Sequence, residues 1–462
     1  MHPIINYIYN TSPVTIQNLM ISLYGIDLYK KRYQGVHREY LEFLRKSQGY
    51  SRYQIENMKL ESLSNLLKYV YKNVPFYQNF FDKRGFKPED IKNEENLRKL
   101  PIVTKDDLRK NPELFISNEF KSNELISIHT SGTTGTPLTF YFKKEAVQKN
   151  YAFFARFLGW AGVKIGDKSA TFAGRVFIPK SQIDPPFWRT NWIMNNTLFS
   201  SYHISERNIP LYIKKLEELN PVFIDSYPSA IYVIARHVLE NCIEHKINPK
   251  AIITSSETLL EHQRDVIEKA FNCKVYDQYG SAEMVVFISQ CEKGSYHINP
   301  EYGIVELINN KGEAVKTGEP GELICTGFLN YAMPLIRYKI GDSAILSHES
   351  CSCNRNFPII KSILGRVDDL IITKDGRMVG RLDPIFKGSS SIKETQIIQE
   401  NIDTILLKIV KGVDFSSAVV DDLIKELQKR VGYDMIIKAE FVDEIPRSET
   451  GKFRSVISKV SQ

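Results

Sequence analysis

The strongest constraint on the fold is an alternation of short apolar runs with longer helical segments between residues 125 and 345. Strand-like runs lie at residues 125–129, 222–225, 251–254, 275–278, 303–308 and 321–326. Strand–helix alternation of this kind predicts an α/β domain. Residues 303–346 contain strand-like runs without helical segments between them, so we expect an antiparallel subdomain or a barrel in that part.

Helical patterns precede this region. Residues 37–47 and 57–72 carry apolar side chains at three-and-four spacing, which predicts amphipathic helices. Val74-Pro75 should break the second helix, and Thr104 is placed to cap the start of a further one.

A second, smaller unit is expected after Gly365. Strand-like residues 394–399 and 404–410 precede a helical segment at 416–431, and residues 435–442 are strand-like again. We therefore predict a large mixed α/β domain at residues 1–365, a hinge at 366–369 and a small α+β lid domain at 370–462.

Charge and composition exclude several classes of protein. The chain has 61 Lys and Arg against 54 Asp and Glu, a net charge of +7 over 462 residues, and no block of five or six like charges. A nucleic-acid partner is therefore not expected, whereas an anionic small molecule such as a nucleotide suits this charge.

Localisation is predicted from what the sequence lacks. It has only six cysteines, no run of about 18 apolar residues and no secretion signal. We expect a cytoplasmic protein with reduced thiols and no membrane span. Peripheral contact with a membrane stays open, and a homodimer is expected only from the general frequency of dimers.

A loop of hydroxyl residues and glycines lies between two strand-like runs. Its members are Ser131, Gly132, Thr133, Thr134, Gly135 and Thr136. Glycines let backbone N–H groups approach a phosphate, and hydroxyl groups add further donors. The loop lacks the Gly-Lys-Ser/Thr end of a Walker loop. By composition alone it fits a plain hairpin turn equally well.

Four more motifs follow the loop in order. They are Tyr279-Gly280-Ser281-Ala282-Glu283, Arg337-Tyr338-Lys339-Ile340-Gly341-Asp342, Gly365-Arg366-Val367-Asp368-Asp369 and Pro446-Arg447-Ser448-Glu449-Thr450-Gly451-Lys452. The ordered set resembles the adenylate-forming superfamily of acyl- and aryl-CoA synthetases. Val74-Pro75-Phe76-Tyr77, residues 100–105 and Ser226-Tyr227-Pro228-Ser229 look most like the phenylacetate–CoA ligase branch, and especially the CapK-type proteins associated with capsular polysaccharide biosynthesis. The resemblance covers nearly the whole chain.

The resemblance implies a nucleotide site. The loop at 131–136 would hold the β- and γ-phosphates of ATP, although Leu138 stands where many members have a lysine. Tyr279 would stack on adenine, and Asp342 would accept both ribose hydroxyls. The base would be lined by the backbone around Asp277, Gln278, Tyr279, Gly280, Ser281 and Ala282. Ser256, Glu257 and Thr258 occupy the place of the family's Gly-Glu-type adenine loop, with serine in place of glycine.

The same resemblance implies the catalytic residues. Glu283 would coordinate Mg²⁺, which prefers carboxylate oxygen; a structural carboxylate at a helix N-terminus is the alternative. Arg366 would face the ribose or a phosphate, and its alternative is a surface ion pair. Lys452 would bridge the substrate carboxylate and the α-phosphate during adenylation. Asp368 would be the hinge about which the small domain rotates between the two half-reactions.

The sequence specifies the acyl pocket and a possible metal site less closely than the nucleotide site. Residues 172–203, rich in aromatics and Asn, together with Tyr227, are candidates for the acyl pocket, although aromatic residues are more often plain core. Cys291, His297, Cys351 and Cys353 form a possible structural zinc set, with His348 as a competing ligand. Cys242, Cys273 and Cys325 are expected in the core.

The predicted function is ATP- and Mg²⁺-dependent adenylation of a small carboxylic acid, with release of pyrophosphate and transfer of the acyl group to an acceptor. Coenzyme A is the expected acceptor, with Lys374, Arg377, Arg381 and Lys387 as candidate cations for it. An amine of a sugar or amino acid is the alternative acceptor. A non-catalytic nucleotide-binding relative is the alternative from another class.

Overall fold

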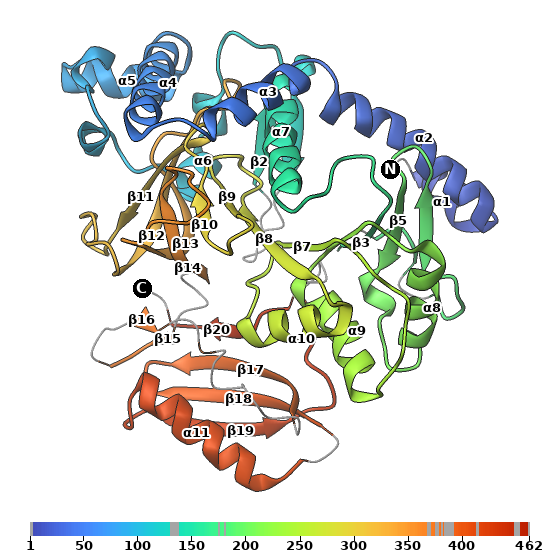
Figure 1. The fold of residues 1–462 in the computed structure, drawn as a ribbon. Helices are drawn as coiled ribbons and strands as arrows, with labels where there is room; N and C mark the ends of the chain where they lie inside the picture. Colours follow the sequence, from blue (N-terminus) through green and yellow to red (C-terminus); the bar gives the residue numbers. More distant parts are fainter. Residues whose placement is uncertain are drawn as a thin grey trace.

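The fold is described from a computed structural model (Figure 1), in which residues 3–129, 138–173, 176–179, 182–366, 371–374, 378–379, 382, 392–412, 415–447 and 453–460 are described. A large unit contains one extended mixed sheet with helices around it, and a small unit of four strands and one helix lies beneath it. The predicted α/β class is confirmed. The predicted boundaries at 365 and 370 stay a prediction.

Seven α-helices precede or flank the first strands of the described chain. Their bounds are α1 Pro3–Thr11, α2 Val14–Tyr33, α3 His37–Ser47, α4 Arg52–Asn73, α5 Pro75–Arg84, α6 Lys105–Lys110 and α7 Lys144–Trp160. Pro75 separates α4 from α5, because proline cannot continue a helix but suits its first turn. Thr104 caps α6 in a reciprocal arrangement with Asp107. Both sequence predictions are confirmed.

The largest sheet in the described chain has twelve strands in the order β11-β12-β13-β14-β10-β9-β8-β7-β6-β3-β5-β4. The strands are β3 Ser169–Ala173, β4 Trp188–Asn191, β5 Asn196–Ser200, β6 Phe223–Ser226, β7 Ala251–Ser255, β8 Lys274–Gly280, β9 Phe287–Gln290, β10 Tyr296–Ile298, β11 Gly303–Ile308, β12 Pro320–Gly327, β13 Tyr338–Leu346 and β14 Ile359–Arg366.

Strand β8 marks the change from a parallel to an antiparallel sheet. It pairs in parallel with β7 and antiparallel with β9. The β11–β14 segment is antiparallel, as the sequence predicted, but it continues the large sheet instead of closing into a barrel. Ligands of α/β sheets bind at the carboxyl ends of parallel strands, especially where the topology changes. The end of β8 is therefore the place to look for a site.

Helices α8 (Ile209–Leu219), α9 (Pro228–Glu240) and α10 (Glu261–Phe271) connect the parallel strands. Their apolar faces pack on β3, β5, β6 and β7 in one core that includes Phe172, Tyr212, Ile224 and Ile234. A second core lies under α4, α5 and α7 and the antiparallel strands. Cys325 is buried there and Cys273 is partly buried, but Cys242 is exposed after α9. Its predicted core position is wrong, because the chain turns there with a positive φ.

The small unit has its own sheet, in the order β19-β18-β17-β20. Its elements are β17 Ile392–Asn401, β18 Thr404–Lys411, α11 Ser417–Val431, β19 Ile436–Phe441 and β20 Val456–Ser458, with the short pair β15 Ile371–Ile372 and β16 Met378–Val379 beside it. Helix α11 covers one face through Val420, Leu423 and Leu427, which are buried in a separate core. These elements agree with the predicted α+β unit.

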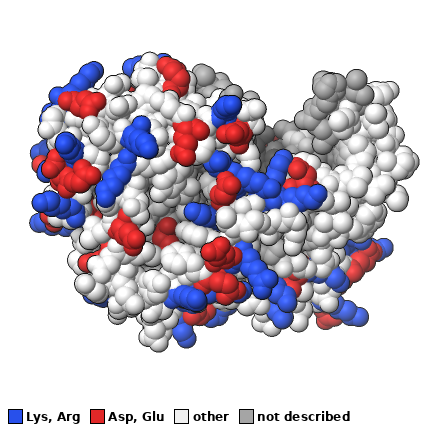
Figure 2. Space-filling model, turned by 90° about the horizontal axis from the view of Figure 1, so that it is seen from above, with Lys and Arg blue, Asp and Glu red and all other residues white. Residues whose placement is uncertain are grey.

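Charged side chains are distributed unevenly over the surface. Seen from above, acidic and basic residues mingle over most of the molecule, whereas the right-hand side, where α1 and α2 lie in Figure 1, is almost uncharged (Figure 2). Among the helices of the described chain, none is long and apolar enough to cross a membrane.

Candidate active site and metal centre

Tyr279, at the end of β8, and Asp342, on β13, meet at the predicted nucleotide site. The Tyr279 hydroxyl donates to Oδ2 of Asp342 over 2.6 Å. Burial, followed by the Asp342 charge, raises the pKa of Tyr279, so the phenol stays protonated and keeps donating. The pair joins the parallel and antiparallel parts of the sheet.

Glu283 lies just beyond the same strand and is buried. Its Oε1 accepts a hydrogen bond from the Tyr338 hydroxyl over 3.1 Å. Tyr338 and Asp342 are both on β13, so this strand brings the two predicted carboxylates into one area. Arg366 stands opposite Asp342 in the β13–β14 register. Its side chain lies outside the described residues, so its contact with the ribose or a phosphate stays a prediction.

The residues between Tyr279 and Glu283 include a buried hydroxyl group without a partner. The Ser281 Oγ is buried and makes no hydrogen bond. A buried polar atom without a partner costs free energy, so this hydroxyl fits a site that is completed by a ligand. Ala282 and Gly280 are exposed beside it.

Asp277 has a structural environment. Its carboxylate accepts hydrogen bonds from Thr254 Oγ1 over 2.6 Å and from the Tyr296 hydroxyl over 2.8 Å. Burial raises its pKa, and these donors oppose the rise. The side chain therefore stabilises the β7–β8 pairing. The predicted contact of the backbone around Asp277 and Gln278 with a base stays a prediction.

The segment Ser256–Thr258 follows β7 and reaches the small unit. Ser256 has φ +71°, a left-handed conformation that glycine adopts more easily. This conformation would suit the glycine that the sequence resemblance implies at this place. Ser256 and Thr258 are exposed.

Glu257 makes three hydrogen bonds instead of facing an open pocket. It accepts from the backbone N–H and the Oγ of Ser229, each over 3.0 Å, at the first turn of α9. It also accepts from the backbone N–H of Phe453 over 2.8 Å. Burial raises its pKa, and these donors oppose the rise. The sequence prediction placed Glu257 in the adenine loop, and it did not anticipate this contact with the small unit.

Phe453 directly follows Lys452 in the sequence. Lys452 and the hinge residue Asp368 lie outside the described residues, as do all six residues of the predicted phosphate loop, 131–136. The loop connects β1 (Ile126–His129) and β2 (Thr139–Phe142), whose antiparallel register pairs His129 with Thr139. The strands predicted on either side of the loop are thus confirmed.

Further contacts join the two units around Glu257. Arg236 Nη1 donates to the Lys393 carbonyl over 2.7 Å, and the Lys393 ammonium pairs with Glu206. A cavity of about 70 Å³ lies at this interface, between Ser229 and Tyr232 of α9 and Thr395 and Phe453 of the small unit.

One cation was not predicted as a site residue. Lys105, at the start of α6, donates to the carbonyl of Ile340 over 2.8 Å, two residues before Asp342. The only signal in the sequence was its place after the Pro-Ile-Val-Thr string, which identified a helix start. Tyr338 belongs to a predicted motif, but its hydrogen bond to Glu283 was likewise not predicted.

The region proposed for the acyl pocket is divided. Tyr227 donates its backbone N–H to the Phe172 carbonyl at the end of β3, on the side of the parallel strand ends. Phe199 is buried in the core, whereas Trp192 and Ile193 are 53% and 52% exposed at the β4–β5 turn. Phe199 therefore packs in the core, and Trp192 and Ile193 face outward, instead of lining an acyl pocket.

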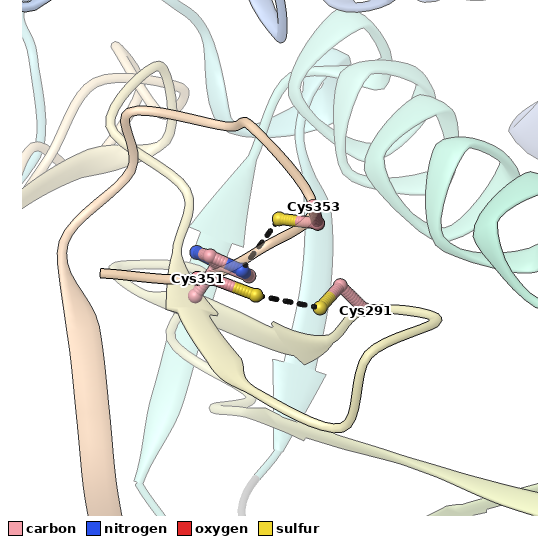
Figure 3. A group of neighbouring side chains, drawn as sticks. Cys291, Cys351 and Cys353 are labelled. Carbon is pink, nitrogen blue, oxygen red and sulfur yellow. Dashed lines mark hydrogen bonds between the residues drawn. The ribbon is translucent and has the colours of Figure 1, made fainter. Parts of the chain in front are cut away.

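The predicted metal ligands converge at the turn that connects β13 to β14 (Figure 3). They are Cys291, His297, Cys351 and Cys353. Their ligand atoms lie within 4.8 Å of one another. The sulfur atoms of Cys291 and Cys351 are 3.6 Å apart, and Cys353 Sγ lies 3.3 Å from His297 Nε2. Around a tetrahedral zinc ion with Zn–S bonds of about 2.3 Å, sulfur atoms lie about 3.8 Å apart. The geometry therefore fits a zinc ion.

The surroundings of these four residues also suit a metal. His297 is buried and its Nδ1 lies 3.4 Å from the Phe357 carbonyl, which turns Nε2 toward the thiols. Burial lowers the pKa of His297 to about 4, so its imidazole is neutral at pH 7. Burial raises the pKa of Cys291 to about 12, so a bound cation would have to deprotonate this thiol. The competing ligand His348 instead contacts the Thr317 carbonyl.

Comparisons with known proteins agree with this geometry. The CapK C-terminal domain family matches residues 371–459. Protein CapK of Staphylococcus aureus is 35% identical over 461 residues, which cover 99% of this chain and all of that protein. Phenylacetate-coenzyme A ligase of Thermus thermophilus is 23% identical and covers 88% of this chain and 97% of that protein.

Solved structures share the fold at lower identity. A 2-hydroxyisobutyryl-CoA ligase in the postadenylation state, in complex with R3-HIB-AMP, has a TM-score of 0.71 at 19% identity and covers 89% of this chain and 91% of that one. The same ligase in the thioesterification state, with CoA, has a TM-score of 0.54 at similar coverage. Together with the full-length match to Protein CapK, these likenesses show that the chain belongs to the CapK branch of the adenylate-forming superfamily.

Proposed function

We propose that this chain is an ATP- and Mg²⁺-dependent ligase that converts a small carboxylic acid to its acyl-adenylate, releases pyrophosphate and transfers the acyl group to coenzyme A. The observation that carries the proposal is the meeting of Tyr279, Asp342 and Glu283 at the end of β8. The names of the relatives support the same chemistry, because they include phenylacetate-coenzyme A ligases.

The reaction needs such a site for a physical reason. A carboxylate is a poor electrophile, and ATP supplies AMP as its leaving group. Because two anions must meet, the protein's task is to place cations and orient the reactants. We assign Tyr279 and Asp342 to the nucleoside, and Glu283 to a Mg²⁺ ion.

The remaining proposed roles depend on the motifs. The loop at 131–136 binds phosphates, Arg366 neutralises charge at the ribose or phosphate, and Lys452 bridges the two reacting anions. Lys105 adds a cation close to Asp342 through its contact with Ile340. The Ser281 hydroxyl, buried and without a partner, is a donor available to a bound ligand.

The contact between Glu257 and Phe453 supports an adenylation arrangement. It fixes the residue after Lys452 against the loop that follows β7. The higher TM-score with the postadenylation structure than with the thioesterification structure supports the same interpretation. We propose that residues 1–365 and 370–462 are the two domains and that rotation about Asp368, within residues 366–369, separates Lys452 from the site after adenylation.

The acceptor is assigned to coenzyme A, with an amine of a sugar or amino acid as the alternative. Among the cations proposed to bind the CoA phosphates, Lys374 lies 3.0 Å from the Asp434 carbonyl and 3.6 Å from its carboxylate. Arg377, Arg381 and Lys387 lie outside the described residues.

The deciding experiment measures pyrophosphate release with ATP, Mg²⁺ and a panel of aryl and short-chain acids. Each acid that is turned over is then incubated with CoA, and separately with hydroxylamine as a generic amine, and the products are identified by mass spectrometry. Thioester formation supports the CoA ligase. Hydroxamate that CoA neither diverts nor accelerates supports an amine acceptor. Release of pyrophosphate with none of the acids would support the non-catalytic relative.

A second proposal concerns the thiol cluster. We propose that Cys291, His297, Cys351 and Cys353 hold one structural zinc ion, with all four coordination positions filled by the protein. Four protein ligands leave no open position for a water molecule or substrate, so the ion would stabilise the fold and not take part in the reaction. The neighbouring Arg355, which stacks 4.3 Å from the Trp160 ring centroid and pairs with Glu292, adds positive charge beside the thiolates.

A further inference from the structure

Helix α2 has its polar face inside and its apolar face outside. Gln17, Ser22 and Gly25 are buried against the molecule. Ser22 Oγ accepts from the Trp192 N–H over 3.0 Å, and Asn18 Oδ1 accepts from the Thr190 N–H over 2.9 Å. These donors belong to β4, the edge strand of the large sheet, or directly follow it. The polar face of α2 therefore satisfies an open sheet edge.

The outward face of α2 is an apolar stripe. Ile16, Leu19, Leu23 and Ile26 follow one another at three-and-four spacing and are 46%, 50%, 57% and 37% exposed. The helix has 20 residues, so the stripe runs along a helix about 30 Å long. A surface helix normally shows the opposite arrangement, with its apolar side chains inward.

The stripe belongs to a larger surface. The Tyr9 hydroxyl on α1 donates to the Phe177 carbonyl over 2.8 Å, which fixes α1 beside residues 176–193. Of the eighteen large apolar side chains exposed in the described part of the chain, thirteen belong to residues 5–29 and 176–193. At about half exposure each, they present on the order of 1,000 Å², more than the largest apolar patch of a typical monomer. We call this surface the α1–α2 face.

Charge around the α1–α2 face is one-sided. Residues 3–26 carry no formal charge, and residues 27–52 carry seven Lys and Arg against three Asp and Glu. Lys30, Lys31 and Arg32 lie in the last turn of α2. Figure 2 shows the corresponding side of the molecule as an almost uncharged area.

This charge pattern selects among partners. In an antiparallel pairing of two copies, the cationic last turn of one α2 would face uncharged residues and the positive N-terminal end of the other helix. In a parallel pairing it would face the same cations. Apart from Asp27, which already pairs with Lys31 of its own helix over 2.7 Å, neither arrangement supplies an anion, whereas a bilayer with acidic headgroups does.

We propose that the α1–α2 face docks on the surface of an anionic phospholipid bilayer. The aliphatic side chains of the stripe enter the boundary between headgroups and acyl chains. Tyr24, Tyr29 and Trp192, which are 55%, 43% and 53% exposed, stand at the level of the headgroups, as aromatic residues with a polar group do at membrane interfaces. The basic last turn of α2 contacts the acidic lipids. This attachment is independent of the proposed reaction.

The test is flotation of the purified full-length chain with vesicles of phosphatidylcholine alone and of phosphatidylcholine with a quarter phosphatidylglycerol. The wild type should float with the anionic vesicles. Leu19→Glu/Leu23→Glu should reduce the bound fraction at least tenfold. Lys30→Gln/Lys31→Gln should reduce it several-fold on anionic vesicles only. The matched control Tyr433→Glu/Ile436→Glu, at sites 72% and 52% exposed in the small unit, should float like the wild type.

Two further measurements keep the proposal open to rejection. Because Trp192 is exposed, its fluorescence should shift to shorter wavelength on anionic vesicles, and Trp192→Phe should lack this shift. Thermal unfolding checks that each variant folds. The proposal is overturned if the wild type does not float, if the control variant loses flotation as much as the stripe variant, or if sedimentation velocity shows a dimer that Leu19→Glu/Leu23→Glu converts to monomer.

Discussion

The cluster around Asp342 and the cluster around Cys351 use the same pair of strands, β13 and β14, but at different ends. Asp342 pairs in register with Arg366 where the strands approach the small unit. Cys351 and Cys353 lie in the turn that connects the strands at their other end. The first cluster shares its hydrogen bonds among β8, β13 and nearby loops, and its predicted lysine comes from the small unit.

The cysteine cluster, by contrast, needs no second unit. Its four ligand atoms already lie within 4.8 Å of one another. The proposals therefore assign different tasks to the two ends of one hairpin, with ligand binding and rotation of the small unit at the Asp342 end and stability at the Cys351 end. Substitutions at the two ends should therefore separate activity from stability.

The largest expected effect is on stability, at the cysteine cluster around Cys351. Cys351→Ser should lower the zinc content from about one ion per chain to below a tenth, and should cost about 3–5 kcal/mol of unfolding free energy, because binding of a structural metal is coupled to folding. Metal analysis and denaturant unfolding measure the two quantities. Cys242→Ser, at an exposed cysteine outside the cluster, is the control. A wild-type chain that is purified gently yet holds less than a tenth of an equivalent of zinc would contradict the zinc proposal.

The next largest effect is on the rate of adenylation, at the proposed site around Asp342. Lys452→Ala should slow acyl-adenylate formation about 10²–10³-fold, the usual loss when one transition-state donor is removed, and should leave the unfolding midpoint unchanged. Transfer from preformed acyl-adenylate should be retained. Lys459→Ala, which removes an exposed lysine paired with Glu400, is the matched control. If Lys452→Ala slows both half-reactions equally, rotation of the small unit is not the way in which the steps are separated.

The two ends also differ in what the sequence could predict. Motif order grouped Tyr279, Glu283 and Asp342, and spacing grouped three cysteines with His297, because both sets belong to short strings with restricted chemistry. The structure brings each group together, and their roles stay predictions. The sequence did not predict the Glu257–Phe453 contact, since one hydrogen bond between a side chain and a distant backbone leaves no pattern. Helices α3, α4 and α11 and strands β6, β7 and β8 were predicted well, because their periodicity is strong, whereas α2 and α7 were given no range.

The α1–α2 face shows a different limit of sequence analysis. A segment with many apolar residues and no charge is normally read as buried. Here Asn18 and Ser22 face inward because the edge strand β4 and the residue that follows it need acceptors for their N–H groups, and Gln17 accepts from the Arg189 side chain. The periodicity of Ile16, Leu19, Leu23 and Ile26 marks one face of a helix, but it does not tell which face is inside. That choice depends on tertiary contacts.

A smaller effect on the adenylation rate is expected where the small unit contacts Glu257. Glu257→Gln replaces one carboxylate oxygen by an amide donor, so at least one of the hydrogen bonds from Ser229 and Phe453 is lost. We expect adenylation to slow about tenfold, in line with the loss of about 1.5 kcal/mol from a hydrogen bond to a charged group, while transfer from acyl-adenylate is unaffected. Glu206→Gln, at the exposed ion pair with Lys393, should change neither rate by more than about threefold. Equal losses for the two variants would show that Glu257 only adds to a general interface.

The smallest effect is expected at Tyr279, where two substitutions separate two roles of the side chain. Tyr279→Phe keeps the ring and removes the hydroxyl that donates to Asp342 over 2.6 Å. If the ring stacks on adenine, the KM for ATP should rise only about twofold to fivefold, because the lost hydrogen bond is made to Asp342 and not to ATP, so that only part of its free energy of about 1.5 kcal/mol affects ATP binding. Tyr279→Ala should raise the KM at least tenfold, because it also removes the aromatic surface. Steady-state pyrophosphate release at varied ATP concentration measures both. Should Phe and Ala raise the KM equally, the contribution of Tyr279 would lie in positioning Asp342, and the ring would have no contact with the base.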